Sequence, residues 1–450
     1  MPGSRRNFLR NATRIAAGVG FTSLDGWGKG TSNQRLEAIN SLSSLDTVKV
    51  GLIGCRNMGW NNLVSLLKNR GVTCAALCDV DRNILQQRAI DAEDKWRTRP
   101  SLYSDYRELL ENKDIDAVII ATPDHWHCLQ MLAACKAGKD VYVEKPIANT
   151  IEECKLMVAA AHKYKRVVQV GQWQRSDPHW LSALDYVRSG KLGRIRTVRA
   201  WAYVTYGRSI AVKPDGLAPE GVNYDMWLGP APDRSFNPNR FHGNFRYFWD
   251  YAGGLMTDWG VHMIDMVLAG MNVIVASSIT ATGGKYGYPD SAPETPDTLQ
   301  AVYDFGDFSM FWEQALGTGT GPYNRSAGEP GVAFVGTSGT LIIDRKTWEV
   351  IPEIANGYAM IEAVSPQTKK SNGLDHHTKN WLECIRLRRQ PNCTVEMGAN
   401  AAINAHLGNI AWRSDAKIQW DKKNGVVINN NQVQQMIKAT YRKPWVLPKI

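Results

Sequence analysis

Between residues 47 and 170, short apolar runs alternate with stretches of helical length, and this alternation constrains the fold more than any other feature. Each run suits a buried strand, and each stretch suits a helix that crosses to the next strand. The pattern predicts a parallel, doubly wound α/β sheet with right-handed crossovers. The strand ends then meet at one edge, where ligands bind. The expected strands are 48–54, 72–77, 117–121, 141–143 and 167–170, and the expected helices are 60–68, 84–96, 129–137 and 151–162.

The turn between the first expected strand and helix carries two glycines. Gly54 permits a tight turn, and Gly59 allows the helix to pack closely on the strand. Free N–H groups at the helix N-terminus would bind a pyrophosphate. Arg56 replaces the middle glycine of the usual G-x-G-x-x-G pattern, and its guanidinium could itself contact a phosphate. Asn57 and Met58 complete this predicted cofactor-binding turn.

Asp79 ends the second expected strand, 25 residues after Gly54. A carboxylate at this position accepts hydrogen bonds from a ribose hydroxyl and repels a 2′-phosphate, which favours NAD over NADP. The alternative is an ordinary turn acid.

Beyond residue 172 the pattern changes to alternating strands separated by loops, several of them rich in glycine and proline. These strands predict an open, mostly antiparallel sheet, and two helices follow it. The expected strands are 195–203, 274–282, 298–305, 308–314 and 332–343, and the expected helices are 379–388 and 399–413.

A carboxylate and an imidazole lie four residues apart in the segment that follows Gly253 and Gly254. On a helix, Asp258 and His262 would share one face. A carboxylate beside an imidazole gives a base with a tunable pKa and a fixed tautomer, as abstraction of a hydroxyl proton requires. The alternative is a capped helix in which His262 is merely hydrogen-bonded.

Two further motifs each follow a strand, Ala-Thr-Pro-Asp-His-Trp-His at 121–127 and Glu-Lys-Pro at 144–146. Together with Asp-x-Gly-x-His-x-x-Asp at 258–265, they strongly resemble the Gfo/Idh/MocA oxidoreductase family, which includes glucose-fructose oxidoreductase and inositol dehydrogenase. The resemblance extends from about residue 48 to 421. It also includes the motifs at 171–176, 227–230 and 249–251.

The resemblance implies a Rossmann domain, an α/β domain with a large open sheet, and nicotinamide in the cleft. We therefore expect an N-terminal signal and linker over 1–46, a Rossmann NAD-binding domain over 47–171, a substrate and oligomerisation domain over 172–421 and a C-terminal tail over 422–450. Family members commonly associate through the open sheet, so we expect a homodimer or homotetramer.

By the same resemblance, Lys145, Asp258 and His262 match the family's catalytic residues. Oxidation of a secondary alcohol needs a base for the hydroxyl proton and a cation for the developing alkoxide. We expect His262 to be the base, oriented by Asp258, and Lys145 to donate to the substrate oxygen. A cis peptide before Pro146 would suit the turn.

The remaining predicted site residues follow strands or lie in the family motifs. For the cofactor we expect contacts with Thr122, Pro123, His127, Glu144 and Lys145. For the substrate we expect contacts with Gln172, Gln174, Arg175, Trp249 and Asp265, of which Trp249 would offer a flat apolar face to a sugar ring. Core packing is the alternative for any single tryptophan.

Two histidines and the cysteines suggest metal chemistry that the spacing does not support. His125 and His127 lie on an expected loop with no third ligand nearby, so we predict no metal site and place His127 beside the nicotinamide ribose. The eight cysteines show no CxxC pair and indicate buried, reduced thiols. Cys128 is expected in the core.

The N-terminus, Ser-Arg-Arg-Asn-Phe-Leu-Arg at 4–10, resembles the twin-arginine export signature. A mildly apolar run and a linker rich in Ser, Gly and Asn follow. This pathway carries folded proteins, so we expect a cofactor-loaded enzyme in the periplasm. The alternative is a disordered basic tail.

Charge and hydropathy limit the classes of partner that the chain is expected to bind. The net charge is +10, and loss of Arg5, Arg6, Arg10 and Arg14 with the signal would leave 10 − 4 = +6, with no basic stripe for nucleic acid. No apolar run of about eighteen residues is present, so no membrane span is predicted.

These features predict an exported oxidoreductase that acts on a sugar, glycoside or cyclitol. Free nicotinamide is scarce outside the cytoplasm, so NAD should be tightly held. One alternative is a glycosidase that uses NAD for transient oxidation and elimination, against which the Glu-Lys-Pro motif argues. The other is a non-catalytic protein that binds a sugar or a cofactor.

Overall fold

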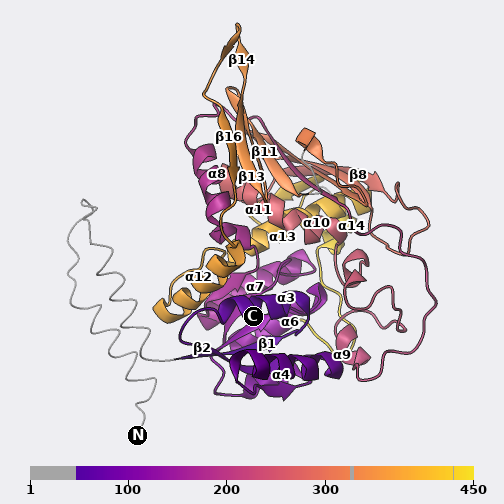
Figure 1. Ribbon diagram of the computed structural model, residues 1–450. Coiled ribbons are helices and arrows are strands. Elements are labelled where there is room, and N and C mark those ends of the chain that lie inside the picture. Colours follow the sequence, from indigo (N-terminus) through magenta and orange to yellow (C-terminus); the bar gives the residue numbers. More distant parts are fainter. Residues whose placement is uncertain (1–46, 325–328, 429) are drawn as a thin grey trace. The chain divides into compact units, whose positions relative to one another are not determined.

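The computed structural model describes residues 47–324, 329–428 and 430–450 (Figure 1). The predicted export signal, with Arg5 and Arg6, lies outside the described residues. No helix in the described part is long and apolar enough to cross a membrane.

The first sheet has six parallel strands within the described residues, in the order β3-β2-β1-β4-β5-β6. The order reverses between β1 and β4, which creates the switch point at which doubly wound folds bind ligands. This confirms the predicted fold class. The strands are β1 (Val48–Ile53), β2 (Val72–Cys78), β3 (Ser101–Tyr103), β4 (Ala117–Ile120), β5 (Asp140–Val143) and β6 (Val168–Val170).

The crossover helices start where short polar side chains accept their first free N–H groups. Asp81 accepts from the N–H groups of Asn83 and Ile84 at the start of α4, and Thr150 accepts from Glu153 in α7. The helices are α3 (Asn57–Leu66), α4 (Arg82–Trp96), α5 (Tyr106–Glu111), α6 (Asp124–Lys136) and α7 (Ile151–Tyr164).

The second sheet has ten strands in the described chain, in the order β16-β13-β12-β11-β7-β10-β9-β8-β17-β18. Its described strand pairs are antiparallel except for β7 with β10, so the predicted, mostly antiparallel sheet is confirmed. The strands are β7 (Thr197–Val204), β8 (Ser278–Gly284), β9 (Thr298–Asp304), β10 (Ser309–Leu316), β11 (Gly331–Val335), β12 (Gly339–Asp344), β13 (Thr347–Pro352), β16 (Val364–Thr368), β17 (Ile418–Asp421) and β18 (Val426–Val427).

Three helices, α8 (Pro178–Arg188), α11 (Gly260–Met271) and α13 (Val395–Ser414), pack between the second sheet and the Rossmann domain (Figure 1). Helix α13 contacts β8 of the second sheet as well as α7 and β6 of the Rossmann domain. Its residues from Ala401 to Ala411 are all buried. The helix therefore fixes the two domains against each other.

Several elements differ from the sequence prediction. The expected strand over 332–343 is a hairpin, β11 and β12, because Gly336 and Ser338 turn the chain. The predicted strands do not include β3, whose first two residues are exposed. Helix α6 begins at Asp124 rather than 129, because Pro123 occupies the N-cap and proline is compatible with a helix start.

Candidate active site

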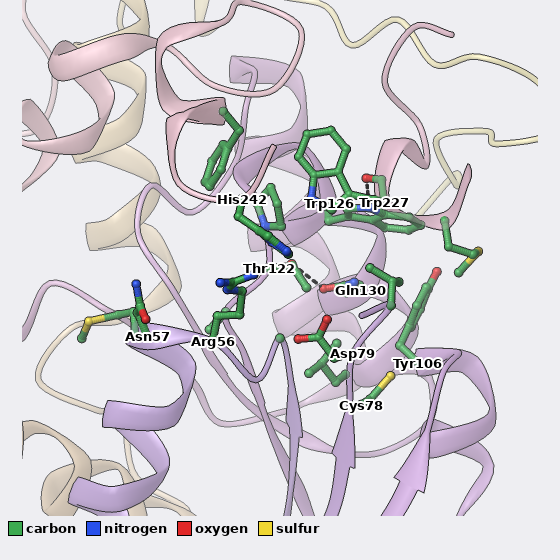
Figure 2. A pocket seen from close by; sticks show the side chains of 18 of the residues that line it. Arg56, Asn57, Cys78, Asp79, Tyr106, Thr122, Trp126, Gln130, Trp227 and His242 are labelled. Carbon is green, nitrogen blue, oxygen red and sulfur yellow. Dashed lines mark hydrogen bonds between the residues drawn. The ribbon is translucent and has the colours of Figure 1, made fainter. Parts of the chain in front are cut away.

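A cavity of about 240 Å³ lies at the carboxyl ends of β1, β2 and β4. Predicted cofactor residues gather on its Rossmann side, as Figure 2 shows for Arg56, Asn57, Asp79 and Thr122. The opposite wall comes from the second domain, which sequence reasoning did not anticipate. The predicted residues lining the cavity are Gly54, Arg56, Asn57, Met58, Asp79, Thr122 and Pro123, and the second domain adds Met226, Trp227, His242, Gly243, Phe245 and Arg246.

The turn from β1 to α3 is built for a close approach. Gly54 has φ +90°, and a Cβ atom there would lie 2.6 Å from the carbonyl oxygen of Ala121. A Cβ atom at Gly59 would lie 2.0 Å from the carbonyl oxygen of Gly54. Helix α3 has no side-chain cap at Arg56 and no acidic residue in its first turn. Its first N–H groups are therefore left for an anionic ligand, as a pyrophosphate requires.

Asp79 has two functions at this edge. Its carboxylate accepts the backbone N–H groups of Cys55 at 2.7 Å and Asp81 at 3.0 Å, which shapes the turn. It also lines the cavity, where a ribose would lie. Burial raises the pKa of Asp79, although the backbone donors oppose this effect.

A second-domain loop is held against the Rossmann domain by a hydrogen bond. The ring of His242 lies 3.2 Å from the Asp81 carboxylate, and the guanidinium of Arg56 lies 3.6 Å from the same oxygen. Arg56 thus pairs with the acid that holds the loop, and it also lines the cavity. The cavity is bounded by parts of the chain that are about 160 residues apart.

Lys145, Asp258 and Arg246 form the central polar network. The ammonium of Lys145 donates to the Asp258 backbone carbonyl at 2.9 Å and to its carboxylate at 2.5 Å, and Arg246 donates to the same carboxylate oxygen at 3.3 Å. Burial opposes ionisation, yet Lys145 and Arg246 hold the pKa of Asp258 at about 2. The predicted pairing of Asp258 with His262 is wrong, because Asp258 ends α10 (Gly254–Asp258) and its carboxylate contacts these two cations.

His262 lies in the first turn of α11 and is buried. Its Nδ1 atom has no hydrogen-bond partner among the described residues. The rings of Trp173 and Trp259 lie 6.4 and 5.8 Å from its ring. Burial, followed by the charge of Lys145, lowers the pKa of His262 well below its usual value. The imidazole is therefore neutral at pH 7, although the lowered pKa also weakens it as a base.

Arg175 and Asp265 are bonded to each other. The guanidinium donates to the two carboxylate oxygens, with Nε at 2.9 Å and Nη2 at 2.7 Å from different oxygens. Asp265 is fully buried, so this pair joins the 3-10 helix Trp173–Ser176 to α11. Asp265 thus positions Arg175, and the predicted contact of Arg175 with the substrate stays a prediction.

Gln172 and Gln174 are also fully buried. The Nε2 of Gln172 and both amide atoms of Gln174 lack hydrogen-bond partners within the described chain. Glu144 accepts from Asn62 at 2.8 Å and from the Lys145 N–H at 3.1 Å, so it orients the Lys145 turn. The Lys145–Pro146 peptide is cis, as expected.

The two histidines after β4 lie on a helix and not on a loop. His127 has its ring nitrogens 2.8 and 2.9 Å from the carbonyl oxygens of Pro146 and Thr122, so it joins two strand-end turns. His127 does not line the cavity, and neither do Glu144 and Lys145, so their predicted contacts with the cofactor stay predictions. His125 contacts the carbonyl oxygen of Trp227 at 3.1 Å. No group of three or more potential metal ligands was found in the described residues.

Trp249 lies apart from the network. Its ring stacks on Trp412 of α13 at 5.9 Å, and the guanidinium of Arg413 lies 4.7 Å from the ring centroid. The contacts of Trp249 thus place it against α13, and its predicted role at the substrate is corrected to packing.

Sequence reasoning missed four charged or polar residues of this region. Arg246 contacts Asp258 and lines the cavity, and Tyr206 accepts from the indole N–H of Trp259. Burial raises the pKa of Asp124 to about 7. Arg345 lies between two tryptophans beside His262. Only Asp124 had a signal, since it belongs to the motif at 121–127.

Comparison with known families matches both domains. Residues 48–172 match the oxidoreductase family with an NAD-binding Rossmann fold, Gfo/Idh/MocA. Residues 194–273 match a C-terminal alpha/beta domain of the same oxidoreductase family.

The curated relatives are named either as a dehydrogenase or as glycosyl hydrolases. An inositol 2-dehydrogenase of Salmonella paratyphi B is 34% identical over 246 residues, which cover 54% of this chain and 69% of that protein. A glycosyl hydrolase family 109 protein of Shewanella baltica OS195 is 32% identical over 203 residues, which cover 42% of this chain. The chain spans only 44% of the length of these hydrolase relatives.

Among solved structures, a levoglucosan dehydrogenase in complex with NADH and levoglucosan has the same fold. Its TM-score is 0.63 at 18% identity, and the match covers 83% of this chain and 98% of that one.

Proposed function

The chain belongs to the Gfo/Idh/MocA family of oxidoreductases, and on that premise we propose that it oxidises a secondary hydroxyl, or reduces the matching carbonyl, of a sugar, glycoside or cyclitol. The observation that carries the proposal is the position of Lys145, hydrogen-bonded to Asp258 beside the neutral His262. The names of two similar proteins, an inositol 2-dehydrogenase and a levoglucosan dehydrogenase, support this substrate class.

Bound NAD would supply the hydride acceptor for the carbinol carbon. The neutral imidazole of His262 accepts the hydroxyl proton. An ammonium has three donors, and Lys145 gives Asp258 two hydrogen bonds. The third is left for the substrate oxygen, where the charge stabilises the developing alkoxide. Asp258 therefore positions Lys145 and does not act as the partner of His262.

The cofactor should be NAD and should be retained. Asp79 lines the cavity with a carboxylate that would repel a 2′-phosphate. Trp227, His242 and Arg246 line the cavity from the second domain and would add contacts that help to retain the cofactor. Retention suits an enzyme that works where free nicotinamide is scarce.

Mass spectrometry of the small molecule released from purified protein tests the cofactor. A panel of sugars and cyclitols, followed at the nicotinamide absorbance, then tests the reaction. We expect bound NAD and its reduction by at least one polyol. Protein that lacks a nicotinamide, and that reduces no added NAD with any panel member, would contradict the proposal.

A second candidate is an NAD-dependent glycosidase. It is favoured by the 32% identity to a glycosyl hydrolase family 109 protein. Transient oxidation acidifies a neighbouring C–H, elimination cleaves the glycosidic bond, and reduction resets the cofactor. Nitrophenyl glycosides separate the two candidates, because a glycosidase releases nitrophenol without net NADH and a dehydrogenase accumulates NADH.

We also propose export by the twin-arginine route and association through the open sheet. Replacement of Arg5 and Arg6 by Lys should retain the protein in the cytoplasm, because the pathway recognises the guanidinium pair. Unchanged export of that variant would contradict the proposed signal.

Val302 and Phe311 are each 37% exposed on the sheet, and light scattering should show a dimer or tetramer.

A further inference from the structure

Arg345 has a position that the reaction above does not explain. It lies in the turn between β12 and β13, and its guanidinium carbon is 4.2 Å from the ring centroid of Trp259 and 4.7 Å from that of Trp173. Both rings also contact His262. A ligand held by Arg345 therefore lies beside the proposed base.

The guanidinium of Arg345 has no anionic partner among the described residues. Its Nε atom has no hydrogen bond there, and no carboxylate comes within ion-pair distance. The nearby acids are paired with other cations. Glu329 pairs with Lys346 at 2.9 Å, and Asp177 pairs with Lys369 at 2.8 Å.

The adjoining network is also cationic. The Asp258 carboxylate contacts both Lys145 and Arg246, so two cations share one fixed acid. Asp124 adds less than a full negative charge at pH 7, because its pKa is about 7. Arg345 therefore adds a positive charge that no described carboxylate balances within ion-pair distance, and charge complementarity calls for an anionic ligand.

We propose that the substrate carries a carboxylate that binds Arg345, which makes the enzyme a dehydrogenase of acidic sugars of the hexuronate class. This inference rests on the proposed oxidation of a sugar hydroxyl. A planar guanidinium presents paired N–H groups that match a carboxylate in a bidentate bond. Stacking on Trp173 and Trp259 fixes the guanidinium plane, so less side-chain freedom is lost on binding.

Binding is tested on NAD-loaded protein by titration calorimetry. D-glucuronate, D-galacturonate and D-mannuronate are compared with D-glucose, D-galactose and D-mannose. At least one hexuronate should bind about 10-fold to 100-fold more tightly than its parent hexose, the range expected for a charge-assisted pair. D-glucose 6-phosphate distinguishes a carboxylate from a phosphate site, and its tighter binding would overturn the proposal.

Substitutions at Arg345 and at an exposed lysine give the matched comparison. R345M should lower hexuronate affinity far more than hexose affinity, and R345K should restore only part of the preference because the planar fork is lost. K370M removes an equal charge from an exposed lysine and should leave both affinities unchanged. Thermal melting verifies that each variant is folded.

The same samples, assayed for NADH formation, separate the two proposals. Oxidation of neutral sugars with no preference for any hexuronate would overturn the carboxylate site and retain the proposed reaction. Arg345-dependent hexuronate binding without oxidation would support the carboxylate site and contradict the reaction. Equal loss of hexose and hexuronate affinity in folded R345M would show that Arg345 only supports the site, and would overturn the proposal.

Discussion

The ammonium of Lys145, just after β5, donates to both the backbone carbonyl and the carboxylate of Asp258, at the end of α10. The two residues are 113 positions apart and belong to different domains. This contact holds Lys145, at a strand end of the Rossmann domain, near His262 in the second domain. The following predictions test what each member of the site does.

Lys145→Met should lower kcat by about 10²- to 10⁴-fold, because it removes the cation that stabilises the alkoxide. NAD binding should persist, because the turn at Gly54 and the Asp79 carboxylate are unchanged. Lys155→Met is the control, since Lys155 lies over Trp420 and bonds to Gly425, outside the network. Normal turnover in folded, NAD-loaded Lys145→Met would remove this role.

His262→Ala should lower kcat by about 10²- to 10⁴-fold, the usual worth of one positioned proton-transfer group. The double variant with Lys145→Met should lose much less than the product of the single effects, because both groups serve one step. Rates are measured beside melting temperature and cofactor occupancy. Lower stability with normal activity per folded molecule would indicate a structural histidine instead.

Asp79→Asn should weaken discrimination against NADP. The amide removes the charge that repels a 2′-phosphate and keeps one of the two oxygens, so one backbone N–H group, of Cys55 or of Asp81, loses its acceptor. The ratio of the NADP to the NAD dissociation constant should fall by about tenfold or more. Nicotinamide fluorescence titrations measure it. A wild-type protein that binds NADP more tightly would show that Asp79 is only a turn acid.

Asp124→Asn should change how stability depends on pH. Burial raises the pKa of Asp124 from about 3.8 to about 7, although Arg246 and Lys145 oppose the shift. The unfolded chain therefore loses this proton first, and the carboxyl costs stability progressively from about pH 4 to pH 7. The variant lacks that cost. Its free energy of unfolding, relative to wild type, should rise by up to about 4 kcal/mol across this range.

Urea unfolding at pH 4, 5.5, 7 and 8 measures the effect of Asp124→Asn. The difference between the two proteins cancels the other titrating groups that they share. A difference that is constant from pH 4 to pH 8 would mean that Asp124 ionises normally in the folded protein.

Trp445→Ala should weaken NAD binding by about 2-fold to 10-fold, the worth of one aromatic pair. Trp445 packs edge-on against Trp126 at 4.9 Å, and Trp126 lines the cofactor cavity. Val446→Ala is the control, because Val446 is 71% exposed. Unchanged NAD affinity in Trp445→Ala would show that the C-terminal segment does not support the cavity wall.

Local strand-turn-helix units explain what could be predicted from the sequence. Gly54, Asp79 and Lys145 each follow a strand of the parallel sheet, and the topology brings all such positions to one edge. The alternation of apolar runs was therefore enough to predict that these three residues lie close together. The second sheet was predicted from a different pattern, the alternating strands beyond residue 172.

The incorrect predictions concern contacts between residues that are far apart in the sequence. Asp258 and His262 have the right spacing to share a helical face, but α10 ends at Asp258 and two cations hold its carboxylate. Arg246 and Arg345 reach the site from a short 3-10 helix and a hairpin turn, and no periodic pattern marks either one. Such contacts depend on how the domains pack, which periodicity does not specify.

Arg246 contacts both the cofactor cavity and the polar network around Lys145. It lines the cavity and donates to the carboxylate of Asp258, which binds Lys145. If a negatively charged cofactor phosphate drew Arg246 away from Asp258, the ion pair between Asp258 and Lys145 would become stronger. If Arg246 moved closer to Asp258, that ion pair would become weaker. Occupancy of one compartment is thereby linked to affinity in the other, and thermodynamic reciprocity requires that the linkage be equal in both directions. Binding in the two compartments is thus coupled through one side chain.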